Sequence, residues 1–337
     1  MSISPMGLDN PADKIDAGAS KAPEEIAGRS PWQLAMEQLR SDKVAMICLG
    51  ILVFFVLVAL FSPLLSRAFG VTIDTPEANI LLSTTGFDGM PVVGPPYNGF
   101  IWAHPLGIAP STGTDNLAFW MYGARTSMGI ALVSTVAATI IGITMGLVAG
   151  FARGPLEAVI SWIIDFFLSL PFILVALSVA PILVSRFSTQ PALLSASQLV
   201  ALLLVLSLTG WMALARLIRG EVLSLREREF VLSARAIGVP TRSILRKELL
   251  PNLIAPIIVS FSLGLPAFVS AEAGLAYLGI GVTNIPSWGR TINAASNYYD
   301  TYPLYLWAPV AGVLTLVVAL NLLGDSIRDA FDPKTRR

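Results

Sequence analysis

The chain has 337 residues, of which 54% are hydrophobic and only 13% are charged, whereas about 25% of the residues of a soluble domain carry a charge. Its formal net charge is zero, so the composition gives no reason to expect binding to nucleic acid. A single cysteine, Cys48, excludes an intrachain disulfide and a multi-cysteine metal site, and the single histidine, His104, lies outside the long apolar runs, which argues against a histidine-based hydrolase, zinc site or proton relay inside a membrane.

The N-terminal region divides into two parts. Residues 1–29 are rich in Pro, Ala, Gly, Ser and Asp, a composition that cannot bury a core and that predicts a disordered tail. Ser30 and Pro31 then form a typical helix start, with an N-cap followed by proline at the first helical position. We expect residues 30–43 to form an amphipathic helix on the inner membrane surface, with a simple continuation of the first membrane span as the alternative. Its apolar stripe consists of Trp32, Ala35, Met36 and Leu39.

Long segments without charge locate the membrane spans, because about 20 apolar residues suffice to cross the hydrocarbon core. Two of the predicted spans extend beyond an uncharged segment and include a carboxylate, Asp165 in the third span and Glu272 in the fifth. Prolines within the segments predict kinked helices. We expect an all-α membrane protein with six transmembrane helices, near residues 44–65, 124–150, 158–184, 196–216, 252–280 and 304–324. The last five would form a core at 124–326, followed by a short tail at 327–337.

The distribution of lysine and arginine predicts the orientation of these spans. If the N-terminus is cytoplasmic, the outer segments hold four of the 22 basic residues and the inner segments hold the other 18. Cytoplasmic loops carry the excess of Lys and Arg, so both termini are expected to be cytoplasmic. A cleaved signal peptide is not expected, because the first long apolar run follows 43 largely polar residues. The four outer residues are Arg67, Arg125, Arg186 and Arg290.

The first outer segment, residues 66–123, is long and rich in glycine and proline. Turn residues at this density favour short strands and loops over helix. Apolar pieces such as Ile80-Leu81-Leu82 indicate that it folds over the outer face, where it would contact another molecule. The alternative is an insertion without a function of its own.

An island of charge follows the fourth predicted span. It runs from Arg216 to Pro251 and holds eight Lys or Arg and four Glu. The helix formers of 217–237 end at Gly238-Val-Pro240, since proline cannot continue a helix and glycine commonly ends one. Thr241 opens a second short helix that runs to Leu250, so the sequence predicts a helix–turn–helix elbow in the cytoplasm.

The elbow carries a small apolar stripe, Phe230, Ala234 and Ile237, at helical spacing within a charged rim. An apolar ridge with a charged rim suits insertion into a groove on a partner protein. The alternative is a helix that merely lies on lipid, which the four glutamates of the island disfavour at an anionic bilayer.

Two stretches of the island, Leu-Ser-Ala-Arg-Ala-Ile-Gly (232–238) and Leu-Leu-Pro-Asn (249–252), resemble the EAA motif, the coupling loop of ABC-importer permeases. Gly238 takes the place of the motif's glycine and Leu250-Pro251 that of its terminal pair. The chain departs from the motif where Leu232-Ser233-Ala234 stands for Glu-Ala-Ala and Glu248 for Ile. By this resemblance, the residues that contact the ATPase are Glu229, Phe230, Ser233, Ala234, Ile237, Gly238, Leu250 and Pro251.

The wider sequence is similar to the dipeptide/oligopeptide/nickel permease family, of the second-subunit (oligopeptide permease C) type, over roughly residues 30–65 and 100–337. One departure concerns the outer motif, where His104-Pro-Leu-Gly107 is followed by an inserted Ile-Ala-Pro-Ser-Thr before Gly113-Thr-Asp115. The similarity is carried by residues 210–220, 225–231, 271–282, 286–289 and 321–333.

The resemblance implies a pore-forming subunit of the type I ABC-importer permease fold in the bacterial plasma membrane. It would pair with a second permease and receive peptides, or related small solutes such as nickel, opines or glutathione, from an external binding protein. Two ATPase subunits, or one fused ATPase, would bind ATP and magnesium and dock on the coupling loop. The chain itself has no Gly-Lys-Ser/Thr, hence no phosphate-cradling loop, and is not expected to be an enzyme or to bind a cofactor.

Polar residues inside the predicted spans are candidates for the path or gate, since ionisable groups in a membrane are costly and often functional. Asp165 either lines the path or bonds a neighbouring helix. Glu272 either shapes the outer gate or pairs with Arg290 or Arg125. Asn321 closes the last helix at the cytoplasmic side. A secondary transporter or channel without an ATPase is the alternative function, but the sequence has no internal repeat of the kind such transporters show.

Overall fold

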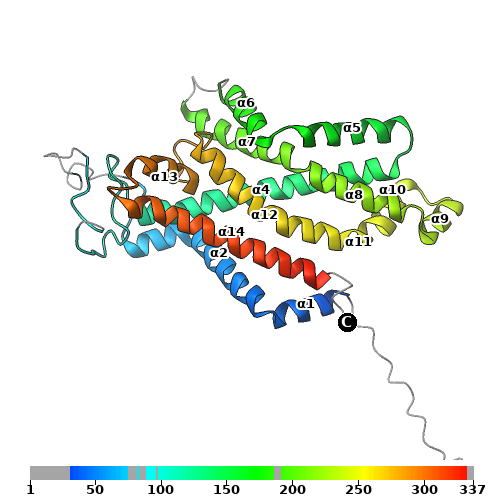
Figure 1. Cartoon of the computed structure of the whole chain (residues 1–337), viewed down its shortest axis with the longest axis horizontal. Helices are drawn as coiled ribbons and strands as arrows, with labels where there is room; N and C mark the ends of the chain where they lie inside the picture. The colour runs from blue at the N-terminus through cyan, green and yellow to red at the C-terminus, as the bar shows by residue number, and fades with distance from the viewer. Residues whose placement is uncertain (1–30, 75–81, 83–88, 96–97, 186–190, 332–337) are drawn as a thin grey trace, which may run out of the picture.

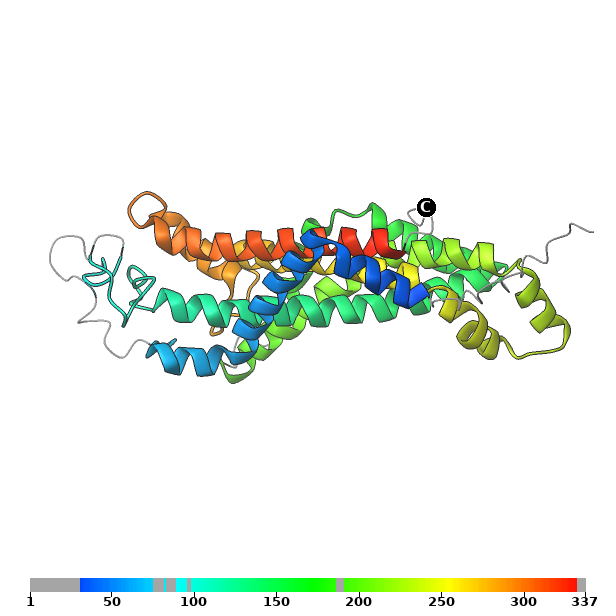
Figure 2. The same ribbon diagram turned by 90° about the horizontal axis from the view of Figure 1, so that it is seen from below.

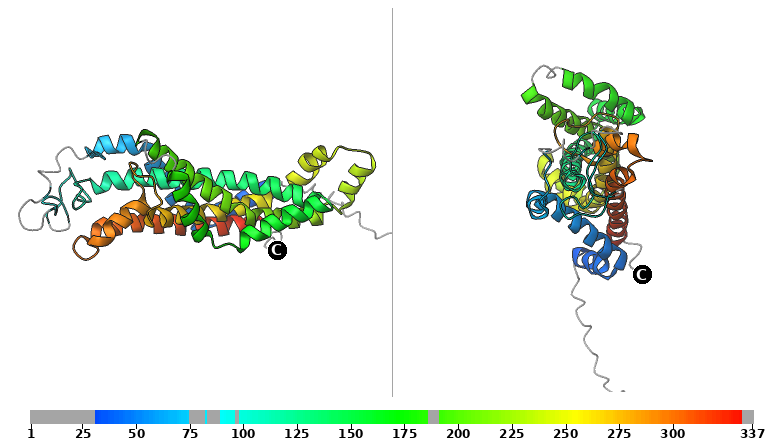
Figure 3. Two further views of the ribbon diagram at one scale, coloured as in Figure 1. Left: turned by 90° about the horizontal axis from the view of Figure 1, so that it is seen from above. Right: turned by 90° about the vertical axis from the view of Figure 1, so that its left-hand side faces the viewer.

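The computed structural model describes residues 31–74, 82, 89–95, 98–185 and 191–331 of the chain. The predicted tail at 1–29 and the last six residues, 332–337, lie outside this part. The described residues form an elongated bundle of helices, with the outer segment at one end and a small helical elbow at the other (Figures 1 and 2). Seen along its length, the bundle has the long helix α4 at its centre (Figure 3).

The longest helices are α2 (Lys43–Phe69), α4 (Asn116–Phe151), α12 (Ile254–Tyr277) and α14 (Pro303–Phe331). The others between the N-terminus and the elbow are α1 (Pro31–Ser41), α5 (Pro155–Ser169), α6 (Phe172–Ser185), α7 (Pro191–Gly210) and α8 (Met212–Leu225). The elbow consists of α9 (Glu229–Ala236), α10 (Thr241–Ser243), the π-helical turn η2 (Ile244–Leu249) and α11 (Leu250–Asn252). At the outer end lie α13 (Trp288–Ala295) and the 3₁₀ turn η3 (Ser296–Tyr298).

Five continuous helical segments are long and apolar enough to cross a membrane, and α5 with α6 would make a sixth as a broken span. The expected single helix at 158–184 is therefore wrong, because the chain bends by 95° between α5 and α6. Leu170 is extended there (φ −83°, ψ 131°), as the residue before a proline usually is. The fourth span is longer than expected, since α7 and α8 together carry it from Leu193 to Leu225.

The outer segment contains turns and two isolated bridges, Leu82–Pro91 and Ile108–Asp115, but no strand among its described residues. The expectation of short strands is thus wrong for this part of the chain, because the glycines and prolines that favour turns interrupt any ladder of backbone hydrogen bonds. The helix α4 begins at Asn116, inside the segment that we expected to end at 123.

The helix α1 ends at Ser41, two residues before the expected end at 43, and a single capping residue, Asp42, joins it to α2. Asp42 accepts a hydrogen bond from the backbone N–H of Val44 (2.9 Å) and another from the hydroxyl of Ser326 on α14 (2.7 Å). The second of these bonds is the main reason why the pKa of the Asp42 carboxyl is lowered. The ring of Trp32 meets that of Phe331 edge-on, with centroids 5.3 Å apart. Both ends of α1 are therefore tied to the C-terminal part of α14.

A glycine seam joins α4 to α8. Gly142, Gly146 and Gly150 recur every four residues on α4 and face α8. A Cβ atom at Gly146 would lie 2.7 Å from Cβ of Ile218, and one at Gly150 would lie 2.6 Å from Cβ of Val222. Small residues at such intervals let helix backbones approach closely inside a membrane, where packing rather than water drives association.

Because the seam has no room for a methyl group, we expect Gly146→Ala to lower the free energy of unfolding by roughly 1–3 kcal/mol, as overpacking does. Gly129→Ala on the same helix is the matched control, since no atom lies within 4 Å of its added Cβ. The measurement is the thermal unfolding midpoint of each purified variant in detergent. Equal midpoints for the two variants would contradict the seam as a tight contact.

Candidate functional site

The elbow lies at the end of the bundle opposite the outer segment (Figures 1 and 2). The expected long helix at 217–237 is interrupted, because α8 ends at Leu225 and α9 begins only at Glu229. The predicted break at Gly238 is confirmed. Gly238 has a φ of +78°, a backbone angle that residues with a side chain rarely adopt. From Thr241 the chain is helical again through η2 and α11.

The apolar residues of the elbow do not form the single exposed stripe that we expected. Ile237 is 81% exposed and Phe230 is 39% exposed, but Ala234 is buried and packs with Ile244 and Leu249 in the interior of the elbow. Leu232, which was not part of the predicted stripe, is 45% exposed. The exposed apolar residues around α9 are therefore Phe230, Leu232 and Ile237. We call these three residues the apolar tip.

The remaining predicted contact residues divide between this surface and the stem. Glu229 and Ser233 are exposed on α9, beside the apolar tip. Leu250 is half-buried and Pro251 is exposed, and both lie in the helical stem that leads into α12. The fold thus brings Glu229, Phe230, Ser233, Ile237 and Gly238 together around α9 but places Leu250 and Pro251 in the stem.

Two arginines anchor the elbow to the inner end of α4. Arg226 Nη1 donates to the carbonyl oxygens of Gly150 (2.9 Å) and Ala152 (3.2 Å). The guanidinium of Arg235 lies over the ring of Phe151, 4.3 Å from its centroid. The last carbonyls of a helix have no partner within it and carry partial negative charge, so they accept arginine well. Charge spacing alone could not reveal these anchors, because they join residues 74 to 84 positions apart.

Asp165 pairs with Arg216 of α8, and a second ion pair between the same helices joins Glu157 to Arg219 (3.3 Å). Of the two readings that we gave Asp165, this contact favours the bond to a neighbouring helix. Both side chains of the Asp165 pair are more than half exposed in the isolated chain, so a role in lining the path stays a prediction.

Glu272 does not pair with Arg290 or Arg125. Its side chain is buried and hydrogen-bonded to Ser127 of α4, and its Oε2 has no partner. Arg290 instead donates to the carbonyl oxygens of Val282 (2.5 Å) and Thr283 (2.7 Å). Of the two alternatives for Glu272, the ion pair is wrong, because the guanidinium of Arg290 bonds carbonyls in the turn before α13.

Next to Glu272 the buried Trp288 locks α13 against α4. Its backbone N–H donates to the hydroxyl of Ser127 (3.4 Å) and its indole N–H to the carbonyl of Trp120 (3.0 Å). The ring also meets those of Phe55 and Trp120, with centroids 5.6 and 5.9 Å away. This cluster fixes the outer end of the bundle, and Glu272 belongs to it.

Asn321, the third polar candidate, donates to the carbonyl of Val317 one turn earlier in α14 (2.9 Å) and is exposed on the isolated chain. The described structure therefore does not bring Asp165, Glu272 and Asn321 together into one site.

A groove that the sequence reading missed lies between α4, α8 and α12, with a volume of about 360 Å³. Hydroxyl side chains line it from two helices: Thr135 and Thr139 from α4, and Ser260 from α12. Gly264 faces the same space, and a Cβ there would touch nothing nearer than 3.9 Å. The sequence contains a spacing that could have indicated this lining. Thr135 and Thr139 are four residues apart, as are Ser260 and Gly264, so each pair shares a helix face.

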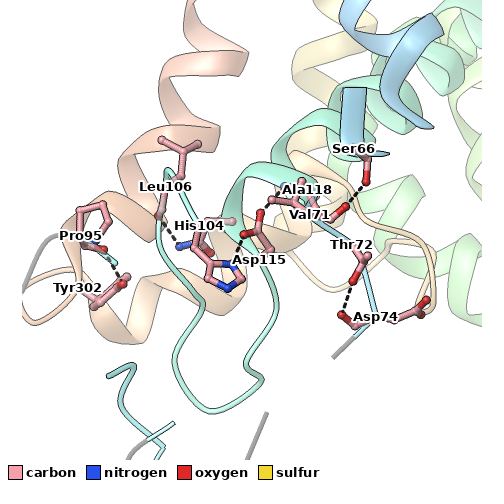
Figure 4. A network of polar contacts seen from close by, with 11 residues as sticks. Ser66, Val71, Thr72, Asp74, Pro95, His104, Leu106, Asp115, Ala118 and Tyr302 are labelled. Atoms are coloured by element: carbon pink, nitrogen blue, oxygen red, sulfur yellow. Dashed lines mark hydrogen bonds and ion pairs between the residues drawn. The ribbon is translucent and has the colours of Figure 1, made fainter. Parts of the chain in front are cut away.

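At the outer end, Asp115 caps α4 and holds the outer segment (Figure 4). Its Oδ1 accepts from the N–H of Ala118 (2.8 Å), and its Oδ2 lies 2.7 Å from Nδ1 of His104. Burial raises the pKa of this carboxyl, an effect that both contacts oppose. Tyr302 at the start of α14 donates to the carbonyl of Pro95 (2.7 Å). The outer motif from His104 to Asp115, which departs from its family pattern, thus joins the outer segment to the bundle.

No group of three or more His, Cys, Asp or Glu side chains in the described part of the chain is placed to hold a metal ion.

Comparison with known proteins gives two family matches. Residues 142–337 match the family described as "Binding-protein-dependent transport system inner membrane component". Residues 30–80 match the "N-terminal TM domain of oligopeptide transport permease C".

Among individual proteins, the chain is similar to the dipeptide transport system permease protein DppC of Alkalihalophilus pseudofirmus, at 31% identity over 93% of each chain. It is also similar to the oligopeptide transport system permease protein OppC of Bacillus subtilis, at 30% identity over 97% of this chain and 99% of that one. Among solved structures, inward-facing MetNI methionine ABC transporter matches with a TM-score of 0.50 and 21% identity, over 64% of this chain and 96% of that one. This last match concerns the fold alone.

We expect Arg226→Gln to loosen the elbow, because a hydrogen bond to a charged group contributes about 1.5–3 kcal/mol. Amide hydrogen exchange across α9 should accelerate about tenfold or more, a factor that corresponds to about 1.4 kcal/mol. Arg228→Gln is the control, since the exposed side chain of Arg228 makes no hydrogen bond or ion pair with any described residue. Equal exchange in the two variants would show that Arg226 is not an anchor.

Proposed function

Because the chain belongs to the family of binding-protein-dependent transport system inner membrane components, and is a permease subunit of the ABC peptide importer family, we propose that the elbow is the surface on which a partner ATPase docks. Family membership confirms the resemblance read from the charged island and its flanking motifs. It also makes this chain a transport component rather than a catalyst, so ATP and magnesium would bind to the ATPase partners.

The observation that carries the proposal is the apolar tip. Ile237 leaves 81% of its surface in solvent at the far end of the molecule, and Phe230 and Leu232 flank it. Charged side chains surround the tip, among them Arg228 and Glu229. An apolar centre with a charged rim is the usual anatomy of a protein interface, and burying a large aliphatic side chain contributes about 1.5–3 kcal/mol.

The contacts that hold the elbow to α4 and α8 would let a movement of the elbow reach the bundle. Arg226 and Arg235 hold it to the end of α4, and α8 leads into it directly. In our proposal, the partner ATPases bind ATP more tightly in one state of the transporter than in the other, and the elbow passes that difference to the bundle. ATP binding would thereby switch the pore between inward- and outward-facing states.

The translocation path would run between this chain and a second permease subunit. We propose that the hydroxyl-lined groove of α4, α8 and α12 faces it, because hydroxyls at mid-bundle can hydrogen-bond a peptide backbone. Asp165 and Asn321, both exposed on the isolated chain, remain candidates for the path. Glu272, inside the Trp288 cluster, would act on the outer gate. An external binding protein would deliver peptides or related small solutes to the outer face.

We further propose that both termini are cytoplasmic, with α5 and α6 together forming the sixth span of a type I permease. The positive-inside distribution of Lys and Arg supports this orientation. It places the elbow, α1 and the inner end of α14 in the cytoplasm and the outer segment outside.

Docking predicts that Ile237→Asp abolishes co-purification of the ATPase and transport, because the new carboxylate would have to be buried without a partner. Val92→Asp is the matched control, an exposed apolar residue in the outer segment that should leave both unchanged. The measurements are pull-down from detergent-solubilised membranes with mass spectrometry, and uptake of labelled peptide. Normal transport by an inserted Ile237→Asp variant would contradict docking on the elbow.

Orientation is tested with single cysteines in a Cys48→Ala background. Cys48 is the only cysteine of the chain, so this background has no other thiol to label. A membrane-impermeant maleimide should label Trp102→Cys in intact cells and Arg40→Cys only after permeabilisation, since both positions are exposed on the chain. Labelling of Arg40→Cys in intact cells would reverse the proposed orientation.

A further inference from the structure

A second groove lies on the other side of α4, enclosed by α2, α4, α12 and α14. Its volume is about 430 Å³, within the range of ligand sites in proteins. The floor is formed by the buried residues Val269, Leu316 and Leu320, and the exposed residues Leu60 and Leu132 form its rim. The residues that line it are apolar with one exception, Arg125 of α4.

Arg125 is an exposed cation without a partner in the described structure. No described residue forms an ion pair or hydrogen bond with its guanidinium. By contrast, ion pairs or hydrogen bonds engage the guanidinium groups of Arg216, Arg219 and Arg226. An arginine at the edge of a membrane is costly unless it reaches the interface or meets an anion. Its planar group matches a phosphate with two parallel hydrogen bonds.

The depth of Arg125 fits the headgroup region of the bilayer. Arg125 and Arg153 bracket the uncharged residues 126–152 of α4 and its end, a helical length of about 40 Å at 1.5 Å per residue. The bilayer is about 30 Å thick across its hydrocarbon core and about 40–45 Å with its headgroup regions, so a segment of this length places Arg125 in the headgroup region on the side opposite the elbow. From there the groove continues toward the middle of the bundle along Leu132 and Leu320.

We propose that this groove binds one anionic phospholipid, with the phosphate on Arg125 and an acyl chain along the apolar floor. A charge at the boundary with an apolar channel leading inward matches one charged head and one apolar tail. A helix of another protein would also fill an apolar groove, but it would need a carboxylate at the depth of Arg125. Every phospholipid carries its phosphate at the depth of the headgroup region, where Arg125 lies.

Binding is measured by native mass spectrometry of the purified full-length chain, titrated with phosphatidylglycerol or with diacylglycerol of the same acyl chains. Wild type should bind phosphatidylglycerol at least about tenfold more tightly than diacylglycerol, and Arg125→Gln should remove that preference. Arg67→Gln, at an exposed outer arginine that does not line the groove, is the control and should keep it. Loss of the preference in both variants, or in neither, would overturn the proposal.

The apolar half of the site is tested with Gly129→Leu. Gly129 lines the groove, and no atom lies within 4 Å of a Cβ built there, so the side chain would occupy the lipid's space without displacing the protein. It should weaken both phosphatidylglycerol and diacylglycerol binding at least about tenfold in a variant that stays monodisperse. Unchanged binding would place the lipid elsewhere on the chain.

A photo-crosslinking amino acid at Leu132 identifies the occupant in membranes where the whole transporter is assembled. A lipid-sized increase in the mass of the chain would support the proposal. A crosslink to another polypeptide would overturn it, because the groove would then be an interface between subunits.

Discussion

The close approach of α4 and α8 is the contact on which the rest of the structure depends. Gly142, Gly146 and Gly150 remove the side chains that would keep the two backbones apart, and in a membrane such packing replaces the hydrophobic driving force. α8 leads into the elbow, and α4 receives the anchoring bonds of Arg226 at its inner end. The elbow therefore stands on a pair of helices that is held together along its length.

Local chemistry explains what the sequence could predict. The break at Gly238, the start of α1 and the existence of the long apolar helices each depend on residues close together in the chain, and the structure has them. Pro171 predicts a kink at Leu170 but not its size of 95°, and helical spacing does not specify that Ala234 turns inward to pack with Ile244 and Leu249. The anchors at Gly150 and Ala152 and the hydroxyl-lined groove likewise depend on which helices become neighbours.

Several polar groups of the bundle have partners on neighbouring helices. Asp165 and Glu157 pair with arginines of α8, and the indole N–H of Trp288 donates to a carbonyl of α4, so these contacts supply hydrogen-bond partners that lipid could not. Glu272 is satisfied only in part, because Ser127 bonds its carboxyl and Oε2 has no partner among the described residues. An incompletely satisfied buried carboxyl is costly, and this one lies where α12, α13 and α4 meet. A rearrangement of these helices that gave Oε2 a partner would recover part of that cost.

The same structure indicates where the bundle can deform. The glycine seam leaves little room for the two helices to move past each other, because a Cβ added at Gly146 or Gly150 would already lie 2.7 or 2.6 Å from Ile218 or Val222. Helical hydrogen bonding is interrupted or altered elsewhere: at Leu170, at Trp211, and through the π-helical turn Ile244–Leu249 into Leu253. A displacement of the elbow would therefore move α4 and α8 as one body, with the stem between η2 and α12 as its hinge. Because Trp288 packs on α4 through Trp120 and Ser127, that body reaches from the elbow to the Trp288 cluster at the opposite end of the bundle along the continuous helix α4.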